Sequence, residues 1–151
     1  MEKLRYSVRI KAPAEVVWTT MLHDASYREW TSVFNSGSYY EGSWDKGSEI
    51  RFLGPDDDGS VGGMIATVEE NRPHEFISLR YTGQIVDGAD DTTSDAAKSF
   101  IGSHENYAFS ESGGVTTVDV ELDSEEDFVA EFNDAWPAAL ARLKDLAESR
   151  A

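Results

Sequence analysis

The C-terminal segment, residues 124–150, constrains the fold most, because it is the clearest helix in the sequence. Its large apolar side chains recur at helical spacing. They are Phe128, Phe132, Trp136, Leu140, Leu143 and Ala147. A helix of about 24 residues spans ~36 Å, more than the ~27 Å of an eight-residue strand, so it can cross a whole sheet. Ser124 with Asp127 resembles a capping box, and Pro137 predicts a kink or a division near Asp134.

The preceding residues predict one strand, two short helices and six further strands. Residues 3–10 alternate between apolar and polar side chains, which is typical of a strand with one buried face. Pro13 marks the first turn of a helix, and a second short helix runs from Asp24 to Trp30. Strands are expected at residues 38–41, 49–53, 61–70, 76–84, 100–110 and 115–122, with an irregular acidic stretch at 86–97. This order predicts one α+β domain over residues 1–151, an antiparallel sheet packed against the C-terminal helix.

Composition excludes several classes of partner and site. The 151 residues include 13 Lys or Arg and 29 Asp or Glu, so the formal net charge is −16. Nucleic acids and anionic membranes bind basic surfaces, so we expect neither as a partner. The acidity fits either a solvated surface that favours solubility or adaptation to high salt. Without cysteine, the chain has no disulfide, thiolate nucleophile or cysteine zinc site.

The hydropathy pattern argues against a membrane protein. No apolar run approaches the roughly 20 residues of a membrane helix, and the first residues lack the apolar core of a secretory signal. We therefore expect a soluble, cytoplasmic protein with no stable membrane association, either a monomer or a weak homodimer.

A curved sheet wrapped around one long helix does not close along its whole length. The short helices would cap one end, and an excess of large aromatic side chains is available to line the remaining space. We expect this lining to include Trp30, Phe34, Trp44, Phe52, Met64, Leu79, Tyr81, Glu105, Tyr107, Phe109, Phe128, Phe132 and Trp136. Each aromatic residue, taken alone, also fits plain core. Residues 86–97 are a candidate gate over the entrance.

The sequence contains few candidates for catalysis or metal binding. His23, His74 and His104 lack the spacing of a helical zinc site. The acidic turn at residues 56–59 lacks the alternating ligands of a calcium loop, and no serine lies in a nucleophile-elbow motif. We therefore expect no catalytic residue, no metal and no cofactor.

Glu105 is the residue with potential for acid–base chemistry. If Tyr107 and Phe109 point into the cavity, the period of two along the strand sends Glu105 inward with them. Desolvation would then raise its pKa, which suits a general acid or base. The alternative is a carboxylate that is paired with Arg51 or Arg80, or that lies at the open end of the pocket.

The order of elements resembles the helix-grip fold of the START-like, SRPBCC superfamily, which includes the birch pollen allergen. Several segments are similar to the branch named after the activator of the ninety-kilodalton heat-shock chaperone's ATPase. They are residues 10–18 (IKAPAEVVW), 27–30 (YREW), 40–48 (YEGSWDKGS), 105–107 (ENY), 113–116 (GGVT) and 136–140 (WPAAL). The resemblance implies a curved antiparallel sheet around a long C-terminal helix and a cavity that holds an apolar or aromatic small molecule. It brings no catalytic signature.

Three functions stay open at this point, because one fold supports many activities. The first is a non-catalytic domain that binds an apolar, aromatic or lipid-like small molecule. The second is an enzyme of the cyclase or dehydratase type that uses an acid–base residue in the cavity. The third is a co-chaperone-like protein-interaction module, which we favour least because co-chaperones of that name carry an additional domain.

Overall fold

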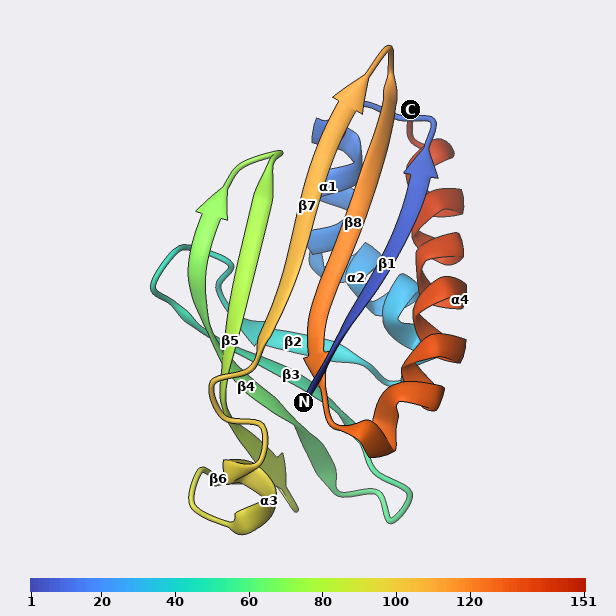
Figure 1. Ribbon diagram of the computed structural model, residues 1–151. Helices are drawn as coiled ribbons and strands as arrows, with labels where there is room; N and C mark the ends of the chain where they lie inside the picture. Colours follow the sequence, from blue (N-terminus) through green and yellow to red (C-terminus); the bar gives the residue numbers. More distant parts are fainter.

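The computed structural model describes residues 1–151, and its central element is an eight-stranded sheet whose paired strands are all antiparallel. The elements are β1 (Glu2–Ile10), α1 (Ala14–Leu22), α2 (Asp24–Trp30), the 3-10 helix η1 (Thr31–Val33), β2 (Tyr39–Gly42), β3 (Glu49–Pro55), β4 (Val61–Arg72), β5 (Phe76–Val86), β6 (Ala89–Asp91), α3 (Asp95–Lys98), β7 (His104–Ser112), β8 (Val115–Ser124), the 3-10 helix η2 (Glu126–Phe128) and α4 (Val129–Glu148). The strand order is β1-β8-β7-β5-β4-β3-β2, with β6 paired to β5. The predicted α+β helix-grip fold is confirmed (Figure 1).

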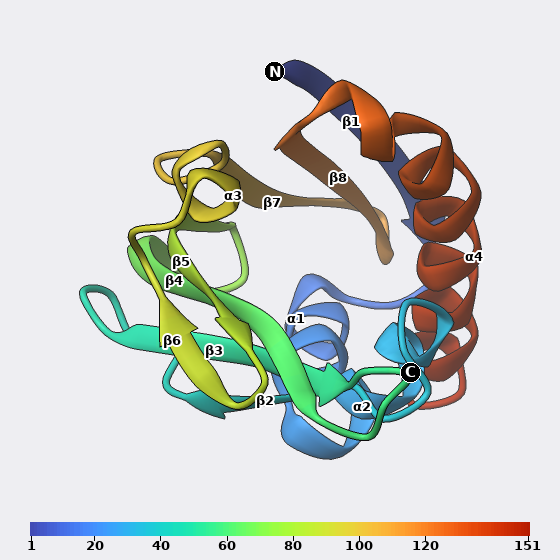
Figure 2. The same ribbon diagram turned by 90° about the horizontal axis from the view of Figure 1, so that it is seen from below.

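The sheet curves so that α1, α2 and α4 all lie on its inner side, as the view from below shows (Figure 2). Part of this curvature comes from β4, whose register against β5 shifts at Ile65/Ala66 and again at Val68/Glu70. Such bulges increase the local twist and bend a strand. Gly63, just before the first bulge, has φ +157°, and a Cβ there would lie 1.9 Å from the carbonyl oxygen of Phe52. Close approach of two strands therefore requires glycine at this position.

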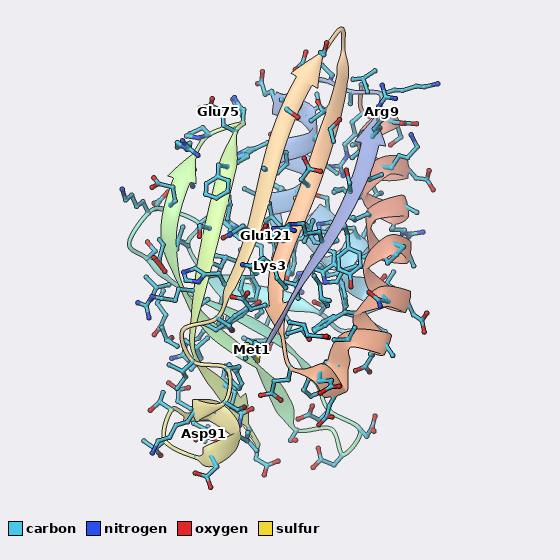
Figure 3. All side chains as sticks on the ribbon, viewed as in Figure 1. Met1, Lys3, Arg9, Glu75, Asp91 and Glu121 are labelled. Atoms are coloured by element: carbon cyan, nitrogen blue, oxygen red, sulfur yellow. The ribbon has the colours of Figure 1, made fainter.

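The predicted alternation along β1 is confirmed by its packing. Leu4, Tyr6 and Val8 pack against the core, and Ile10 is fully buried. The opposite face of β1 and β8 is charged and solvated. The Lys3 Nζ lies 3.4 Å from Glu121 Oε1 there, and Figure 3 labels both residues on these strands. One face of this sheet is therefore core and the other is surface.

One part of the core lies where α1 packs against α4. Met21 of α1 and Ala139, Leu143 and Ala147 of α4 have no exposed surface. Trp30, at the end of α2, is fixed by its indole N–H, which donates to the Met21 carbonyl at 2.9 Å. Small side chains on α4 let the second half of the helix approach the sheet closely. No helix here combines the length and the apolar character that a membrane span requires.

The start of the C-terminal helix was predicted too early. Ser124 is the last residue of β8 and pairs with Glu2, so its backbone belongs to the sheet and cannot cap a helix. Its hydroxyl donates to the Glu125 carbonyl instead. A 3-10 turn follows, and α4 begins only at Val129.

The predicted division of the helix near Asp134 is also wrong, because α4 is continuous through Pro137. A proline removes one hydrogen bond, here the bond to the carbonyl of Asn133. Because Asn133 is exposed, water can donate to that carbonyl, and packing on both sides keeps the helix intact.

Residues 86–97 are more regular than the sequence indicated. They contain β6, which pairs with the end of β5, and the start of α3, whose N-cap Ser94 accepts from the amide of Ala97 at 3.1 Å. The turn continues past α3, since the amides of Phe100 and Ile101 both donate to the Ala97 carbonyl. The strand expected from Phe100 therefore begins only at His104.

Gly63→Ala tests the close approach of β3 and β4. We expect a loss of ~3 kcal/mol or more in the free energy of unfolding, because the methyl group would overlap a backbone oxygen at an unfavourable φ. Gly47→Ala is the matched control: its φ is +86° but a Cβ there meets no atom, so a loss of about 1 kcal/mol is expected. Urea unfolding followed by tryptophan fluorescence measures both. Equal losses of stability in the two variants would contradict the conclusion that the close approach of β3 and β4 requires glycine at position 63.

Candidate binding cavity

A cavity of about 500 Å³ lies between the sheet and the first half of α4. It lies at the end of the molecule where β1 begins, β8 ends and α4 starts, which is the lower end in Figure 1. Fourteen of its 27 lining residues are hydrophobic. This volume lies within the range of sites that hold small organic molecules.

Aromatic rings from separate elements form one wall of the cavity. Trp136 of α4 is central, and its ring lies 6.0 Å from Trp30, 5.0 Å from Phe34 and 6.2 Å from Tyr107, measured between centroids. Trp136 itself is only 3% exposed. Each ring is therefore held by its neighbours, and the wall is preformed.

The mouth of the cavity carries exposed apolar side chains. Phe34 is 38% exposed and Phe128 is 47% exposed, although both contribute to the lining. Met1, labelled in Figure 3 at the lower end of β1, is a further exposed lining residue. An apolar rim around an opening is typical of a surface that a ligand or a partner covers.

The polar centre of the cavity is Glu105 with two tyrosines. The Tyr81 hydroxyl donates to Glu105 Oε1 at 3.0 Å, and the Tyr107 hydroxyl donates to Glu105 Oε2. Glu105 of β7 lies opposite Leu79 of β5 in the register. Tyr107 follows Glu105 by two residues and Tyr81 follows Leu79 by two, so all of these side chains point to the same face of the sheet. Strand geometry alone brings the three groups together.

The environment of this cluster shifts the titration of all three groups. Burial raises the pKa of Glu105, and the two phenol hydrogen bonds oppose that shift only in part. Burial and the nearby carboxylate raise the pKa values of Tyr81 and Tyr107 well above the ordinary 10.0. At neutral pH both phenols are therefore neutral donors to Glu105.

No arginine reaches Glu105, so the ion-pair alternative is wrong. Arg51 Nη1 lies 2.6 Å from Asp90, and Arg80 Nε lies 3.1 Å from Glu69. His104 pairs with the same Glu69 at 2.7 Å on the outer face of β7, opposite to Glu105. No three His, Asp or Glu side chains come close enough to hold a metal ion together.

The structure places ten of the thirteen expected lining residues in the cavity wall. They are Trp30, Phe34, Phe52, Met64, Tyr81, Glu105, Tyr107, Phe128, Phe132 and Trp136. Their role in binding stays a prediction. Residues 86–97, the expected gate, contribute no residue to the lining, and the strand among them, β6, pairs with the end of β5.

Three expected lining residues lie elsewhere. Leu79 is fully buried in the core. Phe109 lies at the far end of β7, where its ring packs 5.1 Å from Trp18 of α1. Trp44 lies between β2 and β3 and donates to the Leu22 carbonyl at 3.1 Å. The sequence pattern predicted that these side chains lie on the inner side of the sheet, but it did not predict whether they lie at the cavity or in the packed core.

Several lining residues were missed by the sequence analysis. Leu122 lies directly opposite Glu105 in the β7–β8 register, so the same alternation that selected Glu105 could have found it. Tyr27 belongs to the second helix, whose periodicity is too short to assign a face. Phe100 and Ser103 follow α3, in a segment expected to be strand.

Comparison with known proteins agrees with this architecture. The family model described as Activator of Hsp90 ATPase homolog 1-like protein matches residues 11–148, which confirms the resemblance noted in the sequence. A search of curated proteins finds no match.

Solved structures share the fold over nearly the whole chain. The Aha1 dimer from Colwellia psychrerythraea is 20% identical with a TM-score of 0.70, covering 98% of this chain and 97% of that one. NE0264 from Nitrosomonas europaea is 10% identical with a TM-score of 0.72, covering 98% and 95%. CalU16 from Micromonospora echinospora is 16% identical with a TM-score of 0.64, covering 96% and 75%. Identities this low establish a shared fold alone.

Glu105→Gln tests the burial of the carboxyl group through the pH dependence of stability. Because the folded pKa lies above the ordinary 4.5, the folded protein loses stability as pH rises from 4.5 through the folded pKa. We expect the variant to be more stable than the parent chain at pH 7 to 8, with a difference that disappears below pH ~4.5. Urea unfolding across this pH range measures it.

Glu121→Gln on the outer face is the matched control with the opposite sign. The hydrogen bond from Arg5 and the charge of Lys3 lower the pKa of Glu121, so its contribution to stability is present above pH ~4.5 and is lost as pH falls. We expect this variant to be less stable than the parent at neutral pH and equal at acid pH. If both variants changed the stability at neutral pH in the same direction, the result would contradict a raised pKa for the buried Glu105.

Proposed function

We propose that this chain, which belongs to the family of Activator of Hsp90 ATPase homolog 1-like proteins, is a binding domain for an apolar or aromatic small molecule. The ligand would occupy the cavity between the sheet and α4. The observation that carries the proposal is the cavity of about 500 Å³ with a preformed aromatic wall and an exposed apolar rim.

The expected affinity follows from the apolar area that such a ligand can bury. Burial of ~300 Å² contributes ~7–8 kcal/mol. Loss of translational and rotational freedom costs about 4–15 kcal/mol and offsets most of this gain. We therefore expect micromolar or weaker binding unless a polar anchor adds to it.

Native mass spectrometry of the freshly purified protein is the first direct observation to make. A stoichiometric small-molecule adduct, released and identified after denaturation, would support the proposal. The same spectrum measures whether the chain is a monomer or a weak homodimer, which stays a prediction, as does a cytoplasmic location.

Binding of the neutral probe N-phenyl-1-naphthylamine tests the cavity. We expect its fluorescence to rise on addition of the protein, and Met64→Trp to weaken binding about tenfold or more, because a larger side chain fills the space beside Phe52. The control is Asp119→Trp, which adds the same ring to the exposed face of β8. Equal affinity in the parent and both variants would argue that the probe binds outside the cavity.

Acid–base catalysis is a second candidate function, and one observation favours it. Glu105 is a desolvated carboxyl group in a ligand-sized cavity, with its pKa raised by burial, which is the environment of many general acids and bases. A base in this position would remove a proton from carbon next to a carbonyl group.

Deuterium exchange separates this candidate from simple binding. 2-Acetonaphthone carries exchangeable methyl protons beside a carbonyl group, and exchange in D₂O is followed by NMR. A catalytic Glu105 predicts exchange that is accelerated by the parent chain and that proceeds at the uncatalysed rate with Glu105→Gln. Exchange at the uncatalysed rate in both would leave binding as the function.

A further inference from the structure

We propose that the ligand class of this cavity is an apolar or aromatic amine whose ammonium group is bound by Glu105, and that anionic amphiphiles are rejected. The inference rests on the proposed function, because it concerns the same cavity. It is carried by the signs of the charges in the wall and by the direction of the hydrogen bonds there.

All formally charged side chains in the cavity wall are acidic. They are Asp56, Glu105, Asp123 and Glu125, and no Lys, Arg or His side chain is among the lining residues. Asp123 is neutralised from outside by Lys3, whose Nζ lies 3.2 Å away. Glu105 has no such counterion. The charged side chains of the wall therefore repel a carboxylate or sulfonate ligand, and the cationic group at the wall is the α-amino group of the exposed Met1 at the mouth. An ammonium ligand would find the unpaired charge of Glu105 deeper in the cavity.

The cluster around Glu105 offers hydrogen-bond acceptors rather than donors. Tyr81 and Tyr107 have already committed their hydroxyl protons to the carboxylate. A carboxylate has about four acceptor sites, so two remain after these bonds, and each phenol oxygen also keeps a lone pair. A ligand group at this position must therefore donate, and an ammonium group has up to three donors.

Most of the other polar side chains of the wall already donate a hydrogen bond within the protein. The hydroxyl or amide groups of Thr31, Asn35, Gln84, Ser103 and Ser124 each donate to an acceptor within the protein. Trp136 Nε1 is buried without a partner, and the hydroxyl groups of Tyr27 and Ser38 are further neutral donors of the wall. Such neutral groups can bind an ether or carbonyl oxygen, but none of them carries a charge that balances a full negative charge.

The aromatic wall adds a second reason for preferring a cation. Trp30, Trp136, Tyr107 and Phe52 all line the cavity. The faces of such rings carry negative electrostatic potential and attract ammonium groups within ~6 Å of the ring centre, most strongly where water is excluded. The apolar part of the ligand and its charged end therefore both have partners in one cavity.

The experiment compares three probes that share one ring and differ in one group: 1-naphthylmethylamine, 1-naphthalenemethanol and 1-naphthoic acid. Isothermal titration calorimetry at pH 8 measures their affinities for the whole chain. We expect the amine to bind about tenfold or more tightly than the alcohol, because a charge-assisted hydrogen bond is added. We expect the acid to bind more weakly than the alcohol.

Glu105→Gln identifies the group responsible. We expect the advantage of the amine over the alcohol to fall about tenfold, with the affinity for the alcohol nearly unchanged. Glu121→Gln removes one negative charge from the outer face and controls for net charge, so its probe order is expected to match that of the parent. Tyr107→Phe keeps the carboxylate and is expected to keep the amine preference.

A second measurement requires no variant. Lowering the pH protonates Glu105, so the amine advantage in the parent chain is expected to disappear while the amine itself stays charged. The tyrosines around Glu105 are Tyr27, Tyr81 and Tyr107, whose raised pKa values keep them neutral. The other ionisable groups of the wall are the carboxyl groups of Asp56, Asp123 and Glu125 and the α-amino group of Met1. Loss of the pH dependence in Glu105→Gln would assign it to Glu105.

The outcomes separate this inference from the proposed function. If the alcohol binds and the amine binds no better than the acid, the inference is overturned and the cavity still stands as a binding site. An amine preference that survives both Glu105→Gln and acid pH overturns the role of Glu105. If none of the three probes binds, the proposed function fails and the inference fails with it.

Discussion

The packing of α4 against the concave face of the sheet is the constraint on which the rest of this structure depends. The second half of the helix presents Ala139, Leu143 and Ala147, which are fully buried, so helix and sheet are in close contact there. The first half presents Phe132 and Trp136, whose bulk is incompatible with an equally close approach. One helix with buried alanines and leucines at one end and large rings at the other therefore both closes the core and leaves the cavity open.

The strand geometry then determines what the cavity contains. Because β7 carries Glu105 and Tyr107 on one face and β5 carries Tyr81 beside them, a carboxyl group and two phenols meet inside a cavity that has an aromatic wall. Burying this carboxyl group opposes folding at neutral pH, since its charged form is poorly solvated. Residues that lower stability in this way are concentrated at functional sites, where the cost is offset by the rest of the fold.

Family membership and fold leave the ligand chemistry undetermined. The similar structures share 10–20% identity with this chain, so the likeness extends to the fold alone. In this protein the wall combines rings with acidic side chains and lacks basic ones. The chemistry of a ligand is therefore better inferred from these particular side chains than from the fold they share with relatives.

Local periodicity in the sequence was sufficient for the order of elements, the α+β class, the buried face of β1 and the inward direction of Glu105, because alternation along a strand is a property of the backbone. It was not sufficient to predict where along the inner face of the sheet a side chain lies. Leu79 and Phe109 point to the inner face as expected, but they lie in the packed core rather than in the cavity. Strand pairing determines that β8 ends at Ser124 and that β6 forms. The ion pairs of Arg51 and Arg80 likewise depend on contacts with other parts of the chain, which local periodicity does not predict. Only the tertiary structure shows that Glu105 has no basic side chain as a counterion, because this depends on where every Lys, Arg and His lies in the fold.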